Sequence, residues 1–142
     1  MESEHVRGVT ITAGIVTVSS SRTPDLDISG QTIRSLLEKS GMTVSYYAVV
    51  PDDMERIRKE FFQVLEKANC VIFNGGTGLT YDDCTIEAIE PLLEKRVDGF
   101  GEIFRLLSFE EIGASALLSR AVGGVFKGKA VFCIPGSPKA VQ

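Results

Sequence analysis

Short apolar runs alternate along this chain with segments whose apolar residues recur at helical spacing. Three runs rich in β-branched residues predict strands at 11–18, 44–50 and 71–74. Two more runs, at 123–126 and 130–134, are joined by Lys-Gly-Lys and predict a short hairpin near the C-terminus. The alternation favours an α/β fold of three layers, with a mostly parallel sheet and helices on both of its faces.

The segments between these runs carry apolar residues three, four and seven positions apart, as amphipathic helices do. One helix is expected to open at 27–30 and to close at Gly41. The next is expected to start at 51–55, where Asp52 and Glu55 have the spacing of a capping box. Further helical segments are expected at 85–95 with an interruption at Pro91, at 100–107 and at 109–121.

Composition limits the fold and the function. With 142 residues, 44% of them hydrophobic and 24% charged, the chain is expected to form a single domain over 1–142.

A net charge of -4 and a pI near 5.0 argue against nucleic acid as a partner. No apolar stretch approaches the roughly 20 residues that span a bilayer, so no membrane association is expected. The acidic first residues do not resemble a signal peptide, and the expected compartment is the cytoplasm.

Cysteine and histidine usage gives no sign of a metal-thiolate site. Cys70, Cys84 and Cys133 are odd in number and show no CxxC spacing, and the single histidine is His5. Neither a disulfide nor a zinc site is therefore expected.

The segment 74–85 carries the clearest chemical signal. Three glycines and two threonines follow the predicted strand at 71–74, and two carboxylates, Asp82 and Asp83, come next. Glycine lets the backbone approach an anion, and successive N–H groups can form an anion-binding concavity. Two carboxylates would repel a bare phosphate, so this pairing favours a divalent metal between them. The alternative is a turn before a helix that Asp83 or Thr85 caps.

This segment matches neither of two standard glycine-loop signatures. It lacks the lysine of a P-loop, and the last position of a G-x-G-x-x-G pattern falls on Tyr81. A phosphate-binding loop without its own lysine needs a metal, or a base from elsewhere in the chain. Arg22, the only base in its loop, is one candidate, although a solvated side chain is equally consistent with the sequence.

Four polar or glycine-rich loops follow the predicted strands, at 19–22, 51–53, 75–78 and 135–138. In open parallel sheets the ligand crevice lies outside the carboxyl ends of the strands. We therefore expect these loops to gather at one edge of the sheet and to form a binding site there.

Six motifs follow one another over nearly the whole chain, from Ile15 to Val141. They are Asp-Ile-Ser-Gly at 27–30, Val-Pro-Asp-Asp at 50–53, Gly-Gly-Thr-Gly-Leu-Thr with Asp83 and Thr85 at 75–85, Gly-Phe-Gly-Glu-Ile-Phe-Arg-Leu-Leu-Ser at 99–108, Ala-Leu-Leu-Ser-Arg-Ala at 116–121 and Pro-Gly-Ser-Pro at 135–138. In this order they resemble the motifs of the MoaB/MogA family of molybdenum cofactor biosynthesis.

The resemblance implies a molybdopterin adenylyltransferase, which transfers AMP from ATP to the terminal phosphate of molybdopterin and releases pyrophosphate. Mg²⁺ is the implied cofactor and ATP the co-substrate, in a molybdenum or tungsten pathway. Hand-over of the product to a molybdate-insertion protein is also implied. The alternative within the family is a non-catalytic molybdopterin-binding or assembly paralogue.

The resemblance also assigns roles to individual residues. Asp83 matches the aspartate of the glycine motif and is expected to be catalytic and to bind the metal. Asp52 is the second catalytic candidate, with helix capping as its structural alternative. The residues expected to bind substrate are Ser29, Gly30, Gly75, Gly76, Thr77, Gly78, Thr85, Gly136 and Ser137.

The chain departs from the family pattern in two places. Asp82 stands where relatives commonly have arginine, so we expect weaker phosphate binding unless a second metal compensates. The chain ends at Gln142, where relatives continue into a long helix, and we expect this helix to be missing. A third reading, a stand-alone relative of domains in molybdate-insertion and competence-associated proteins, is disfavoured because those domains lack the motifs at 99–108 and 116–121.

The segment 99–121 holds more apolar area than one face of a small domain readily covers. Large exposed apolar patches usually mark an interface, so we expect a homotrimer or a hexamer. The alternative is that these residues complete the core beneath the sheet. They are Phe100, Ile103, Phe104, Leu106, Leu107, Phe109, Ile112, Leu117 and Leu118.

Overall fold

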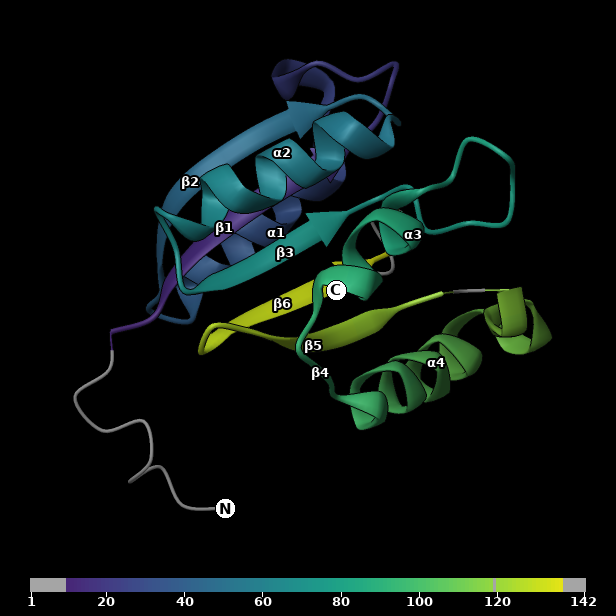
Figure 1. The fold of residues 1–142 in the computed structure, drawn as a ribbon. Helices are drawn as coiled ribbons and strands as arrows, with labels where there is room; N and C mark the ends of the chain where they lie inside the picture. Colours follow the sequence, from purple (N-terminus) through teal and green to yellow (C-terminus); the bar gives the residue numbers. More distant parts are fainter. Residues whose placement is uncertain (1–9, 119, 137–142) are drawn as a thin grey trace.

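The computed structural model of the protein describes residues 10–118 and 120–136, which contain a six-stranded sheet of order β2-β1-β3-β6-β5-β4 (Figure 1). Strands β1, β2, β3 and β6 run parallel, whereas β5 is antiparallel to both β6 and β4. The mostly parallel sheet and the hairpin of β5 and β6 are confirmed. The strands are β1 (Thr12–Val18), β2 (Thr43–Val50), β3 (Cys70–Asn74), β4 (Lys95–Arg96), β5 (Val122–Phe126) and β6 (Lys129–Ile134).

Helices cover both faces of the sheet. Figure 1 shows α2 crossing one face in front of β1, with α1 behind the sheet. The α-helices are α1 (Ile28–Lys39), α2 (Met54–Leu65), α3 (Thr85–Ile89) and α4 (Asp98–Ile112). Short 3-10 turns are η2 (Pro24–Leu26), η3 (Glu90–Leu92) and η4 (Gly113–Leu118). Among the described residues no helix is long and apolar enough to cross a membrane.

The core lies on the face that α2 and α3 cover. Phe61 of α2 stacks on Phe73 of β3 with ring centroids 6.2 Å apart. The predicted buried stripe is confirmed: Ile57, Phe61, Val64 and Leu65 of α2 are buried, and so is Ala68 just beyond the end of the helix. Successive strand residues point to opposite faces. Phe132 of β6 therefore faces the other side, where its ring lies 4.9 Å from that of Phe100 in α4.

The ends of α1 agree with the sequence, whereas the start of α2 differs from it. Gly41 has φ +89°, and the N–H groups of Gly41 and Met42 close α1 onto the carbonyls of Glu38 and Leu37. The predicted capping role of Asp52 is wrong. The cap of α2 is Asp53, whose carboxylate accepts from the N–H groups of Glu55 and Arg56 at 2.9 and 3.1 Å. Asp52 is thereby free for other contacts.

Two predicted helices end earlier than expected. The helix predicted at 85–95 stops at Ile89, because Pro91 cannot donate a backbone hydrogen bond, and Lys95 and Arg96 form β4 instead. The segments predicted at 100–107 and 109–121 form one helix that ends at Ile112. Gly113 then takes φ +72°, the chain continues as a 3-10 turn to Leu118, and the helical prediction for Ala121 is wrong.

Candidate functional site

The loops that follow β1, β2, β3 and β6 meet at one edge of the sheet, as the strand order predicts. They surround a cavity of about 370 Å³. The residues that line it are Val18, Ser19, Arg22, Asp52, Gly75, Gly76, Thr77, Gly78, Asp83, Leu118, Arg120, Pro135 and Gly136. This first cavity therefore combines a glycine-rich floor with two carboxylates and two arginines.

The backbone at 75–78, termed the glycine loop, has a shape that side chains would block. Gly75 and Gly76 have φ +103° and +69°. A Cβ on Gly75 would lie 2.7 Å from the Val18 carbonyl oxygen, and one on Gly76 would lie 2.2 Å from Thr85 Oγ1. The loop after β6 also approaches closely, because a Cβ on Gly136 would lie 3.1 Å from the Gly75 Cα. Close backbone approach and positive φ both require glycine here.

Asp52 packs against Gly76 of the glycine loop. Its Oδ2 accepts from the Ser20 N–H at 3.1 Å and from the Ser20 hydroxyl at 2.9 Å, which ties the loop after β2 to the loop after β1. Its Oδ1 takes no hydrogen bond from a described residue and would lie 3.3 Å from a Cβ on Gly76. One oxygen of this half-buried carboxylate is therefore left for a ligand.

Asp83 packs against Gly78 of the same loop. Its Oδ2 accepts from the Thr80 N–H at 3.1 Å and from the Thr80 hydroxyl at 2.7 Å. The same oxygen would lie 2.6 Å from a Cβ on Gly78, so this carboxylate packs directly on the glycine loop. The alternative capping role of Asp83 is not observed, because the N-cap of α3 is Cys84 and has no side-chain capping bond. Asp82 is exposed and does not line the cavity.

Two arginines from other segments bring positive charge to the cavity. Arg22 donates to the Ser29 hydroxyl at 2.9 Å, to Asp27 at 3.4 Å and to the Gly136 carbonyl at 3.4 Å. Arg120 donates to carbonyls of the glycine loop and pairs with Glu87 at 2.6 Å. The hydrogen bond between Arg120 and Glu87 lowers the pKa of the carboxyl and raises that of the guanidinium. The base that the glycine loop lacks is thus supplied from elsewhere in the chain.

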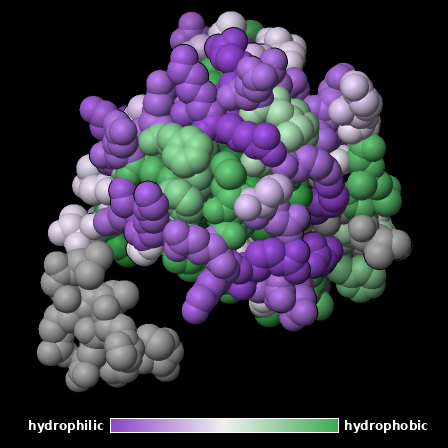
Figure 2. Space-filling view, viewed as in Figure 1, coloured by the Kyte–Doolittle hydropathy of each residue, from purple (hydrophilic) through white to green (hydrophobic). Residues whose placement is uncertain are grey.

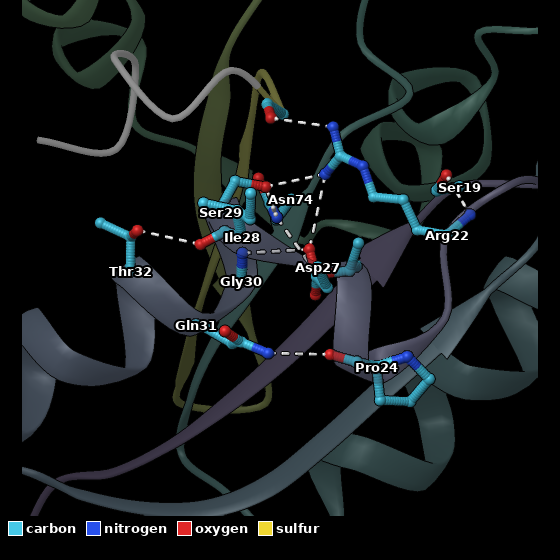
Figure 3. Close-up of polar contacts among 12 residues, drawn as sticks. Ser19, Arg22, Pro24, Asp27, Ile28, Ser29, Gly30, Gln31, Thr32 and Asn74 are labelled. Carbon is cyan, nitrogen blue, oxygen red and sulfur yellow. Dashed lines mark hydrogen bonds and ion pairs between the residues drawn. The ribbon is translucent and has the colours of Figure 1, made fainter.

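A buried polar network lies behind Arg22 (Figure 3). Asp27 is fully buried and accepts from the Thr17 hydroxyl at 2.5 Å, the Gly30 N–H at 3.1 Å and the Tyr47 hydroxyl. Burial and the hydrogen bond to Asp27 raise the pKa of Tyr47. This network fixes the start of α1 against the sheet.

Ser29 and Asn74 join this network to the glycine loop. The Asn74 side-chain amide donates to Ser29 at 2.9 Å and to Thr17 at 3.1 Å, while its buried Oδ1 has no hydrogen-bond partner among the described residues. Asn74 directly precedes Gly75, so the network holds the beginning of the glycine loop. Ser29 and Gly30 are buried within it and do not line the cavity.

The structure therefore divides the residues predicted from the sequence. Seven of them line the first cavity: Asp52, Gly75, Gly76, Thr77, Gly78, Asp83 and Gly136. Ser29, Gly30 and Thr85 are buried behind it, and Ser137 lies outside the described residues. Sequence reasoning missed Arg120 as a site residue, although it belongs to the Leu-Ser-Arg-Ala motif and an arginine in a motif was a usable signal.

The donor set suits a magnesium ion that shares its coordination with a substrate. No group of three His, Cys, Asp or Glu side chains among the described residues could hold a metal alone. Asp52 and Asp83 each keep one carboxylate oxygen outside the described hydrogen bonds. Mg²⁺ commonly binds through one or two carboxylates plus substrate phosphates. Burial, followed by the charge of Asp52, raises the pKa of the nearby Cys84 thiol.

A second cavity of about 520 Å³ adjoins the first and shares Arg120 with it. It lies between α3, α4 and β5, and its charged lining includes Arg96, which pairs with Glu90 and Asp98. None of the residues predicted for the site lines this cavity. Of the two cavities, only the first is lined by described residues that the sequence predicted for the site.

The fold and the first cavity define an α/β protein with a glycine-loop ligand site at the carboxyl ends of its parallel strands. Residues 14–142 match the protein family described as "Probable molybdopterin binding domain", so the chain belongs to this family. The resemblance to MoaB and MogA proteins is thereby confirmed.

Individual relatives agree with this assignment. Molybdenum cofactor biosynthesis protein B of Bacillus anthracis is 48% identical over 131 residues, which cover 90% of this chain and 78% of that protein. A crystal structure of a molybdenum cofactor biosynthesis protein B superposes with a TM-score of 0.89 at 46% identity, covering 93% of this chain and 84% of the other. The tungsten cofactor synthesizing protein MoaB of Pyrococcus furiosus superposes with a TM-score of 0.85 at 38% identity, covering 94% and 86%.

Proposed function

We propose that this protein is a Mg²⁺-dependent molybdopterin adenylyltransferase of molybdenum or tungsten cofactor biosynthesis. The observation that carries the proposal is that Asp52 and Asp83 line the same cavity and each pack against the glycine loop. Membership of the molybdopterin-binding family and relatives named for molybdenum and tungsten cofactor synthesis support the choice of substrate.

In the proposed reaction the terminal phosphate of molybdopterin attacks the α-phosphorus of ATP. A bond forms between a phosphate oxygen and the α-phosphorus, the bond to the bridging α–β oxygen breaks, and its electron pair leaves with pyrophosphate. Because the nucleophile is already anionic, no side chain has to remove a proton. Catalysis of this kind depends on positioning and on charge neutralisation.

The residues of the first cavity divide this work. Asp52 and Asp83 would hold Mg²⁺ through the oxygens that their hydrogen bonds to Ser20 and Thr80 leave free. When bound, the ion supplies positive charge that offsets the charge of the reacting phosphates. The glycine loop lets the phosphates approach the backbone, and Arg22, whose charge is balanced by Asp27 at 3.4 Å, would offer guanidinium donors at the cavity wall.

The experiment that tests the proposal is adenylyl transfer by Asp83→Asn. The assay combines ATP, molybdopterin and Mg²⁺ and detects the adenylylated product. Loss of one ligand charge from a metal that neutralises phosphates is expected to lower the rate at least about a hundredfold, while the fold is retained. Asp82→Asn is the matched control, because this neighbouring carboxylate is exposed and does not line the cavity.

Unchanged turnover of Asp83→Asn, with Mg²⁺ still required, would remove Asp83 from the mechanism. Product formation by neither the wild type nor the variants, with molybdopterin still bound, would favour the non-catalytic paralogue. The exposed position of Asp82 favours turnover despite the missing arginine, because its charge is screened by solvent. Under this proposal the partners are ATP, molybdopterin and a downstream molybdate-insertion protein, and the compartment is the cytoplasm.

A further inference from the structure

Four successive carbonyl groups of the glycine loop are held by two side chains and one backbone amide. The Gly75 carbonyl accepts from Thr85 Oγ1 at 2.8 Å, and the Gly76 carbonyl accepts from the Thr85 N–H at 3.0 Å. The Thr77 carbonyl accepts from Arg120 Nε at 2.9 Å, and the Gly78 carbonyl accepts from Arg120 Nη2 at 2.7 Å. Every carbonyl from Gly75 to Gly78 is therefore turned toward Thr85 or Arg120.

This arrangement determines where the N–H groups point. All peptide bonds described in the structure are trans, and in a planar trans peptide the N–H points opposite to the C=O. The N–H groups of Gly76, Thr77, Gly78 and Leu79 belong to these four peptide units and so point away from Thr85 and Arg120. None of the four donates a hydrogen bond to another described residue. They form a row of free donors in the loop that lines the first cavity.

We infer that Arg120 is a positioning residue, which turns two peptide units of the glycine loop so that their N–H groups bind a phosphate oxyanion. Thr85 does the same for the two preceding units. The inference deepens the proposed function and rests on it only for the choice of phosphate as the anion. Successive N–H groups of this kind are a known form of anion-binding concavity.

Glu87 holds the Arg120 guanidinium in the orientation that reaches the glycine loop. It accepts from Arg120 Nη1 at 2.6 Å and from Nη2 at 3.3 Å, so it orients the guanidinium and balances its charge. Glu87 lies in α3, which begins at Thr85. The same short helix therefore holds the first two carbonyls directly and the last two through Arg120.

Arg120 could instead bind the phosphate itself, and the two roles predict opposite results. If its charge acted directly, Glu87→Gln would raise the local positive charge and tighten phosphate binding. If Arg120 positions the loop, Glu87→Gln loosens the guanidinium and weakens binding. Arg120→Lys also distinguishes the two roles. Lysine keeps the positive charge, so a direct role predicts little loss of binding, but its single ammonium group cannot hold two carbonyls as the planar guanidinium does, so the positioning role predicts weaker binding.

The test is a titration of the whole chain with inorganic pyrophosphate at fixed Mg²⁺, followed by the amide ¹H–¹⁵N signals. The wild type is expected to show its largest shifts at Gly76, Thr77, Gly78 and Leu79. Arg120→Lys and Glu87→Gln are each expected to weaken binding by about tenfold or more. Arg96→Lys is the matched control, since Arg96 is also ion-paired but does not line the first cavity.

Two further readouts keep the inference falsifiable. Guanidinium ion at a non-denaturing concentration is expected to restore part of the affinity of Arg120→Ala, which simple unfolding would not allow. Tighter binding by Glu87→Gln, equal affinity of Arg120→Lys and wild type, or shifts that avoid the glycine loop would each overturn the positioning role. None of these measurements depends on turnover. The positioning role of Arg120 can therefore be refuted even if the protein transfers adenylyl groups, and it can be supported even if the protein does not.

Discussion

At the scale of single residues, glycines with positive φ serve two purposes in this chain. Gly41 at the end of α1 has φ +89°, and a Cβ placed on it would meet no neighbouring atom within 4 Å, so only its backbone conformation favours glycine. Gly76 has φ +69° and also lies against Thr85 and Asp52. At Gly76 both the backbone conformation and the lack of space for a Cβ require glycine. A loop that binds its ligand through backbone groups has this requirement.

We predict that Gly76→Ala lowers the free energy of unfolding by about 2–5 kcal/mol, the sum of left-handed strain and overpacking. Gly41→Ala is the control and is expected to cost only the strain, about 1–2 kcal/mol. Urea denaturation of both variants gives the comparison. Equal losses would mean that the loop shifts freely away from Thr85, and that its shape is less constrained than the contacts indicate.

At the scale of elements, adjacent carboxylates at the start of α2 have different tasks. Asp53 caps the helix, whereas Asp52 lines the cavity and is tied to Ser20. The capping-box spacing in the sequence pointed to Asp52, but the Asp53 backbone is extended at φ -146°, as an N-cap should be.

Substitution of each aspartate is expected to separate stability from function. Asp53→Ala should lower the free energy of unfolding by about 0.5–2 kcal/mol and leave ligand binding intact, because only the cap is lost. Asp52→Ala should weaken the binding of Mg²⁺ and pyrophosphate strongly and should lower the free energy of unfolding only slightly. Thermal denaturation and calorimetric titration measure the two effects, and a larger stability loss in Asp52→Ala would contradict this division.

At the scale of the whole molecule, the apolar segment 99–121 is divided between core and surface. Ala116 and Ala121 are buried, whereas Phe100, which packs on Phe132, is only half-buried and lies on the face opposite the α2 core. Six large apolar side chains of the segment are about half exposed; they are Ile103, Leu106, Leu107, Phe109, Ile112 and Leu118. Figure 2 shows hydrophobic residues gathered at the right-hand edge of the molecule, where Figure 1 places the end of α4 and η4.

We predict that this surface associates with further copies of the chain, as a trimer or a hexamer, because exposed apolar patches of this kind usually mark interfaces. Light scattering at micromolar concentration should give a mass of at least three times the 15.4 kDa chain mass. Leu107→Glu should reduce that mass, whereas Leu26→Glu, a control at an exposed leucine of η2, should not. A monomeric wild type would refute the prediction.

Much of the fold could be predicted because periodicity is a local property. The alternation of strands and helices, the stripe on α2 and the closing glycine of α1 were all readable from residues close together in the chain. The loops of the site could be predicted too, because parallel strands place their carboxyl ends at one edge. The sequence by itself therefore determined the architecture and the glycine loop, and it offered Asp52 and Asp83 as candidates, but the metal expected between Asp82 and Asp83 is not supported because Asp82 lies outside the cavity.

Only the tertiary structure decided which residues act through others. Arg120 lies 42 and 43 positions from the carbonyls that it holds, and Ser20 lies 32 positions from Asp52. Ser29 and Thr85, expected to touch substrate, are buried behind the cavity, where the Ser29 hydroxyl accepts from Asn74 and the Thr85 hydroxyl donates to the Gly75 carbonyl. Such roles depend on contacts between distant segments, and spacing along a chain carries no information about the direction in which a side chain or a peptide N–H finally points.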